Sequence, residues 1–92
     1  MLFRSQQAAV LQAQVQALVA SGSLTPTEGA GLMDKLKEIM IKLNQGTTKP
    51  ACNQLKAFIN QVNGIIYDGG LTLQQGAELI TAANKLRANI GC

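Results

Sequence analysis

The fold is decided by the stretch QVQALVASGSLTPTEGAGLMDKLKEIMIKL at residues 14–43, because a second version of it, QVNGIIYDGGLTLQQGAELITAANKLRANI, returns at residues 61–90. The two stretches align without a gap at an offset of 47 residues. Identical pairs are Gln14 with Gln61, Val15 with Val62, Gly22 with Gly69, Leu24 with Leu71, Thr25 with Thr72, Gly29 with Gly76, Ala30 with Ala77 and Leu32 with Leu79. Each copy is typical of a helix, a Gly-x-Leu-Thr turn and a second helix, which predicts two αα-hairpins.

Each turn carries signals for the end of one helix and the start of the next. A glycine ends the first helix of each copy, as expected for a left-handed residue after a helix C-terminus. Thr25 and Glu28 then have the spacing of a capping box, with Pro26 at the first helical position. Thr72 and Gln75 repeat this box in the second copy.

The hydrophobic periodicity predicts an all-α fold, an up-down four-helix bundle made of two repeated αα-hairpins. We expect a single helical domain over residues 1–92, with one hairpin at about 2–45, a linker at 46–49 and the other hairpin at about 50–92. Pro50 is expected to be the first residue of the third helix. The side chains expected to be almost wholly buried are those of Leu55, Ile59, Val62, Leu79 and Leu86.

The composition favours a neutral surface. Only 14% of the residues are charged, the net charge is +3, and Asn and Gln are abundant. The densest basic run, Lys35 to Lys42, is preceded by Asp34 and interrupted by Glu38, and there is no Trp. We therefore interpret the lysines as a solvated helix face and expect no nucleic-acid partner. No apolar run is long enough for membrane insertion, and no signal peptide is present in this chain.

The two cysteines are predicted to form a disulfide. Cys52 falls in the first turn of the third predicted helix and Cys92 just past the end of the fourth. These ends are neighbours in an antiparallel hairpin, within the separation that a disulfide requires. The alternative is two unrelated thiols, one buried and one on the tail. A disulfide would place the protein outside the cell or at the cell surface.

Gly29 and Gly76 occupy matching positions inside predicted helices, where each costs about 0.5–1 kcal/mol relative to Ala. Close approach of two helices is the favoured explanation. A helix N-terminus left open for an anion is the alternative.

The residues exclude most kinds of catalysis. There is no His, and the five carboxylates are scattered along the chain. General acid–base work and nucleophilic activation need such groups placed together. Two cysteines without a histidine also cannot complete a tetrahedral zinc site. We expect neither an enzyme nor a bound metal or cofactor.

Polar side chains on the third predicted helix form a candidate binding surface. Its members are Asn53, Asn60, Gln61, Asn63 and Tyr67. Amides can hydrogen-bond to sugar hydroxyls or to another protein. An equally strong alternative is that Asn60 and Gln61 bond loop carbonyls and hold the bundle together.

The chain also resembles a known family. The resemblance rests on the Ala-Phe-Ile-Asn-Gln-Val run at 57–62, and on further apolar and turn positions from about residue 11 onward. Those positions include Ala30, Leu32, Lys35, Leu36, Gly46, Lys49, Ala51, Leu55, Leu71, Ala77, Leu79, Ile80 and Ala83. The chain resembles the FIMAH-type module and, more distantly, the FIVAR modules. The resemblance implies a small helical accessory module in a large secreted or surface protein of bacteria, and it carries over no binding residues.

The function expected from these features is a non-catalytic interaction or spacer module of a larger exported protein, acting through protein–protein contact. A glycan or cell-wall polysaccharide binding domain is the alternative. Self-association is a further possibility, through apolar residues at helix ends such as Leu2, Phe3 and Met40.

Overall fold

The computed structural model describes the backbone of residues 4–92 and the side chains of residues 7–92. It contains four helices in this part of the chain. They are α1 (Arg4–Ala20), α2 (Pro26–Asn44), α3 (Thr48–Tyr67) and α4 (Leu73–Ile90). Leu2 and Phe3, which the sequence suggests for self-association, lie outside the described residues.

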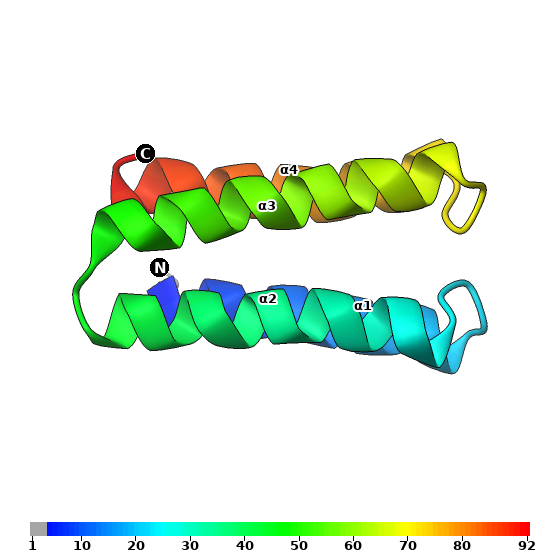
Figure 1. Cartoon of the computed structure of the whole chain (residues 1–92), viewed down its shortest axis with the longest axis horizontal. Coiled ribbons are helices and arrows are strands. Elements are labelled where there is room, and N and C mark those ends of the chain that lie inside the picture. Colours follow the sequence, from blue (N-terminus) through cyan, green and yellow to red (C-terminus); the bar gives the residue numbers. More distant parts are fainter. Residues whose placement is uncertain (1–3) are drawn as a thin grey trace.

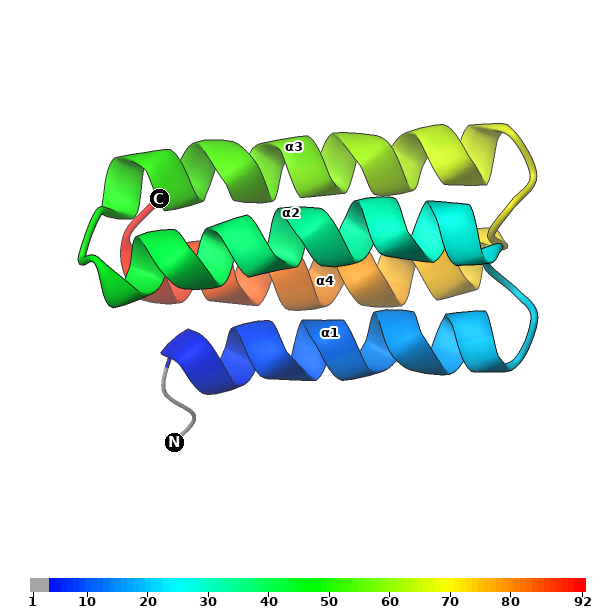
Figure 2. The ribbon, with the colours of Figure 1, turned by 60° about the horizontal axis from the view of Figure 1, so that its bottom comes forward.

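The helices form a four-helix bundle in which each runs antiparallel to the next (Figure 1). The α1–α2 and α3–α4 turns lie together at one end, while the α2–α3 connection lies at the other (Figures 1 and 2). Each helix packs against the next, and α1 also packs against α4. The bundle therefore has two contacts between its hairpins, the α2–α3 seam and the α1–α4 seam. The predicted all-α bundle is confirmed.

Both capping boxes form as predicted. The Thr25 hydroxyl accepts a hydrogen bond from the Glu28 backbone N–H at 3.1 Å, and the Glu28 carboxylate accepts one from the Thr25 N–H at 3.0 Å. Thr72 and Gln75 repeat the same pair of bonds at the start of α4. Gly22 has a φ of 85°, a left-handed conformation that glycine adopts without steric cost. The capping boxes and the left-handed glycine predicted from the sequence are thus present at the ends of these helices.

The two helix glycines mark close approaches within each hairpin. A Cβ built on Gly29 would overlap Cγ2 of Val19, and a Cβ built on Gly76 would overlap Cγ1 and Cδ1 of Ile66. Val19 and Ile66 are themselves equivalent in the repeat. These close approaches confirm the packing explanation for both glycines.

The core is aliphatic, with one aromatic ring. The buried apolar residues are Ala8, Leu11, Val15, Leu24, Leu32, Leu36, Ile39, Ala51, Leu55, Phe58, Val62, Ile65, Leu71, Leu79, Ala83, Leu86 and Ile90. Four of the five predicted core residues are among them. The prediction for Ile59 is wrong: it is half-buried and packs against the core from its edge, because Phe58 and Val62 occupy the centre of the α3 stripe.

The start of α3 also differs from the prediction. The helix begins at Thr48 after the N-cap Thr47, which places Pro50 at the third helical position rather than the first. A proline is tolerated there because the N–H groups of the first turn have no intrahelical acceptor. The connection between the hairpins is correspondingly shorter than residues 46–49.

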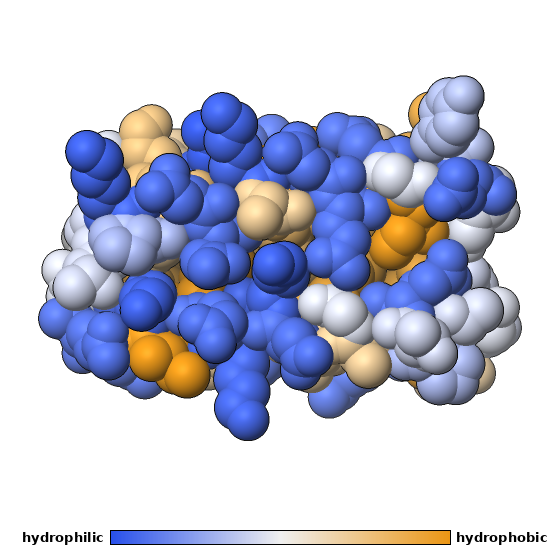
Figure 3. All heavy atoms as spheres, viewed as in Figure 1, coloured by the Kyte–Doolittle hydropathy of each residue, from blue (hydrophilic) through white to orange (hydrophobic). Residues whose placement is uncertain are grey.

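A disulfide joins Cys52 and Cys92, with a Cα–Cα distance of 5.8 Å. It links the fifth residue of α3, in the second turn of that helix, to Cys92 two residues beyond the end of α4, and the predicted pairing is confirmed. Among the described residues, no helix combines the length and the apolar character needed to cross a membrane. The face over α2 and α3 is mostly hydrophilic, with small separate hydrophobic spots (Figure 3).

Candidate functional site

Four of the five predicted binding residues lie together on the exposed side of α3. Asn53, Asn60, Asn63 and Tyr67 are exposed, and their spacing of seven, three and four residues places them on one helix face. The Tyr67 side chain is 91% exposed. This α3 face offers three amides and one aromatic ring to solvent.

Gln61 does not belong to that face. It is half-buried, and its amide lies over Gly31 of α2, where a Cβ would come within 2.7 Å of Gln61 Nε2. Within the described residues, neither Asn60 nor Gln61 forms a side-chain hydrogen bond to a loop carbonyl. The structural alternative for these two residues is therefore not supported by the hydrogen bonding.

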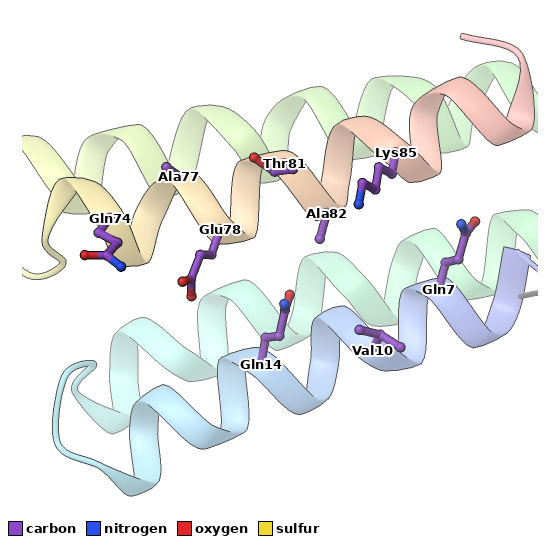
Figure 4. Close-up of a pocket in the computed structure, with 9 residues that line it drawn as sticks. All are labelled: Gln7, Val10, Gln14, Gln74, Ala77, Glu78, Thr81, Ala82 and Lys85. Carbon is purple, nitrogen blue, oxygen red and sulfur yellow. The ribbon is translucent and has the colours of Figure 1, made fainter.

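A second candidate site lies in the α1–α4 seam, which sequence reasoning missed. A groove there encloses about 500 Å³, and α1 contributes Gln7, Val10 and Gln14 to it. The α4 wall consists of Gln74, Ala77, Glu78, Thr81, Ala82 and Lys85. Gln7 and Gln14 project from α1 toward α4, while Glu78 and Ala82 project back toward α1 (Figure 4). We call this site the α1–α4 groove.

The groove continues toward the turn end of the bundle. A further hollow of about 350 Å³ shares Gln14 and Glu78 with it and extends along α1 to Ser21. From Gln7 to Ser21 the helix rises about 21 Å. At this end the Gln75 side chain donates a hydrogen bond of 3.0 Å to the Ser23 hydroxyl, which ties the two hairpin turns together. The site is therefore elongated, and the hydrogen bond between Gln75 and Ser23 bounds it at the turn end.

The two seams carry different side chains at equivalent positions of the repeat, and α2 and α3 pack more closely than α1 and α4. At the offset of 47 residues, the α1–α4 seam is the counterpart of the α2–α3 seam. Glu78 stands where α2 has Gly31, and Val10 stands where α3 has Ala57. Gly31 leaves room for the Gln61 amide to lie against α2. The equivalent places in the α1–α4 seam carry the larger side chains of Glu78 and Val10, whereas Ala82 of α4 is smaller than its counterpart Lys35 of α2.

Two glutamine oxygens in the groove have no partner within the protein. Gln7 Oε1 and Gln14 Oε1 are both buried, and neither accepts a hydrogen bond from the described residues. Their repeat counterparts Gln54 and Gln61 have no such buried, unpartnered atom. A buried carbonyl without a donor costs about 1–3 kcal/mol, so each of these two requires an explanation.

The described lining of the groove consists mainly of neutral polar and apolar side chains. Among the described residues that line it, Glu78 and Lys85 are the only charged ones, and they lie two turns apart on α4. The described residues contain no group of three His, Cys, Asp or Glu side chains that could hold a metal ion. The remaining polar groups are amides and a hydroxyl, which donate and accept hydrogen bonds.

The groove residues gave no signal in the sequence when each copy was considered alone, because glutamine, alanine and threonine are ordinary on a helix surface. A position-by-position comparison of the two copies could have found them. The pairs Gly31 with Glu78 and Lys35 with Ala82 are large changes of volume at positions whose second members line the groove.

Comparison with known proteins places most of the chain in one family model. The model of the FIMAH domain matches residues 8–88, which include all of the groove residues except Gln7. No curated protein and no solved structure shows a significant match to the chain.

Proposed function

The chain belongs to the FIMAH domain family, and on that basis we propose that it is a non-catalytic module that mediates protein–protein contact for a larger exported protein. FIMAH domains are accessory modules, and the family is not a catalytic one. The Cys52–Cys92 disulfide supports an extracellular or cell-surface location, because such bonds persist in oxidising compartments.

The observation that carries the proposal is the α1–α4 groove. It is the place where the repeat departs from a closed seam, and it contains two buried oxygens without donors. A fold selected only as a spacer would gain stability by closing this seam as it closes the other one. We therefore assign the contact with a partner to the groove.

A second candidate function is glycan binding through the α3 face. Its support is Tyr67, which is 91% exposed and shares a helix face with three asparagine amides. An exposed aromatic ring beside hydrogen-bonding side chains suits the apolar and polar faces of a sugar. Against this function, a single ring gives a small platform.

Both functions can be tested with the chain immobilised for surface plasmon resonance. The protein fraction and the polysaccharide fraction of culture medium from the producing organism are passed over it separately. Two variants provide the controls: Val10→Ala/Glu78→Gly, which copies the closed seam, and Tyr67→Ala on the α3 face. We expect binding from the protein fraction that the double variant abolishes and Tyr67→Ala preserves. Binding from the polysaccharide fraction that Tyr67→Ala abolishes would establish the second function instead, and no binding from either fraction would contradict both.

A further inference from the structure

Helix α1 is held in the bundle by a small set of apolar contacts. Of the side chains that the structure describes in α1, three apolar ones are buried, Ala8, Leu11 and Val15, whereas α3 buries five. In the described part of the chain, no side-chain hydrogen bond joins α1 to another helix. The attachment of α1 therefore depends on one narrow apolar stripe and the partly buried residues beside it.

Two buried oxygens weaken this attachment. Gln7 Oε1 and Gln14 Oε1 both belong to α1, and each is removed from water without gaining a donor from the described residues. The third buried and unpartnered atom among those residues, Arg87 Nε, lies on α4. When α1 leaves the bundle, water again donates hydrogen bonds to both glutamine oxygens. The gain from burying the apolar stripe of α1 is thus partly offset by a penalty that detachment removes.

The disulfide holds one hairpin together and leaves the other without a covalent link. The Cys52–Cys92 bond encloses most of α3, the following turn and all of α4, whereas α1 lies outside this loop. The equivalent positions of the first hairpin are Ser5 and Gln45, which cannot form such a bond. Of the two helices at the looser α1–α4 seam, α4 is therefore tied to α3 and α1 is not. The closer α2–α3 seam keeps the other three helices together when α1 departs.

We propose that α1 detaches from the bundle as a unit while α2, α3 and α4 stay together, so that α1 is a removable wall of the α1–α4 groove. A helix of 17 residues without tertiary contacts is marginal in water, so the detached α1 loses its backbone hydrogen bonds. Detachment takes Gln7, Val10 and Gln14 out of the groove and thereby abolishes the site. Control of partner binding by α1 rests on the proposed function, whereas the detachment itself does not.

The test is native-state hydrogen exchange of the oxidised full chain, followed by NMR. The repeat provides matched amides, because Leu11 and Val15 (the α1 pair) are equivalent to Phe58 and Val62 (the α3 pair), and all four side chains are 0% exposed. A bundle that opens in a single step gives both pairs the same protection factor. We expect the α1 pair to be at least roughly tenfold less protected than the α3 pair. Leu11 and Val15 should also share one urea dependence, because both exchange through the same opening.

Reduction of the disulfide separates detachment of α1 from global unfolding. The loop closed by Cys52 and Cys92 stays folded when only α1 leaves, so the bond restricts the fully unfolded state and not the detached state. Reduction should therefore lower the protection of the α3 pair by a larger factor than that of the α1 pair.

A substitution tests the contribution of the buried oxygens. Gln14→Leu removes one buried acceptor and should raise the protection of the α1 pair roughly fivefold or more. The matched control is Gln61→Leu, the same change at the equivalent position of the repeat, and it should not raise the protection of the α1 pair.

Equal protection of the two pairs would overturn the proposal, and so would an equal loss of protection at both pairs on reduction. Exchange at Leu11 that is independent of urea, beside exchange at Val15 that depends on it, would show fraying of a helix end in place of detachment as a unit. Unchanged or lowered protection in Gln14→Leu would refute the buried oxygens as a cause. All of these measurements use the free chain, so their failure leaves standing the partner contact that surface plasmon resonance tests.

Discussion

Replacing Gly76 by alanine should destabilise the bundle, although alanine is the better helix former. Gly76 is buried in α4, and a Cβ there would overlap two atoms of the Ile66 side chain. One of the two is Cγ1, which is attached directly to Cβ of Ile66. Rotation of the terminal methyl group alone therefore does not remove the overlap, and the side chain or the helix must shift.

Gly64 provides the matched control. It lies in α3, it is exposed, and a Cβ there would have no heavy atom within 4 Å. Gly64→Ala should therefore stabilise the fold by about 0.5–1 kcal/mol through helix propensity alone. Gly76→Ala gains the same amount but also incurs an overpacking cost of about 1–3 kcal/mol. The difference in unfolding free energy between the two variants isolates that cost and should be about 1–3 kcal/mol.

The assay is urea unfolding of the oxidised proteins, followed by circular dichroism. Both variants should keep the wild-type m-value, which shows that the midpoints report stability. If Gly76→Ala proves as stable as Gly64→Ala, the close approach between α3 and α4 is refuted as the reason for the glycine.

Other predictions concern the disulfide, the core and a helix cap. Reduction of the Cys52–Cys92 bond, which closes a sequence separation of 40 residues, should lower the unfolding free energy by about 4 kcal/mol in the loop-entropy model; an unchanged denaturation midpoint in reductant would contradict this. Leu86→Ala should cost about 2–5 kcal/mol, because the side chain is fully buried, and a loss below half a kcal/mol in the same assay would refute its central position. Thr72→Ala should cost about 0.5–2 kcal/mol by removing a hydroxyl that accepts the Gln75 N–H, whereas Thr81→Ala on the exposed side of α4 should have little effect in thermal unfolding.

Most of the fold could be predicted from the sequence because local signals and the repeat agree. Thr25 and Thr72 cap helices through bonds that involve residues three positions away, so the relevant chemistry is local. The reason for Gly29 and Gly76 lies in a contact with another helix, which local sequence does not encode. Their recurrence at the offset of 47 residues nevertheless indicated a shared packing cause. The predicted burial of Ile59 was wrong, because its exposure at the edge of the apolar stripe of α3 depends on where the neighbouring helices lie.

The candidate site was harder to predict, because it is a property of two helices at opposite ends of the chain. The α3 face was predictable from the helical spacing of Asn53, Asn60, Asn63 and Tyr67. The α1–α4 groove depends on how far apart α1 and α4 settle, and its walls come from both helices. No pattern within one helix encodes that separation.

The most direct test of the groove as the binding site is a map of backbone amide shifts. The 15N-labelled chain is titrated with the protein fraction that binds it in surface plasmon resonance, and the wild type is compared with Val10→Ala/Glu78→Gly. We predict that the largest shifts follow α1 and α4 on either side of the groove, from Gln7 to Ser21 and from Gln74 to Lys85, and that they vanish in the double variant. Shifts that centre on the α3 face around Tyr67, or that survive in the double variant, would contradict the account.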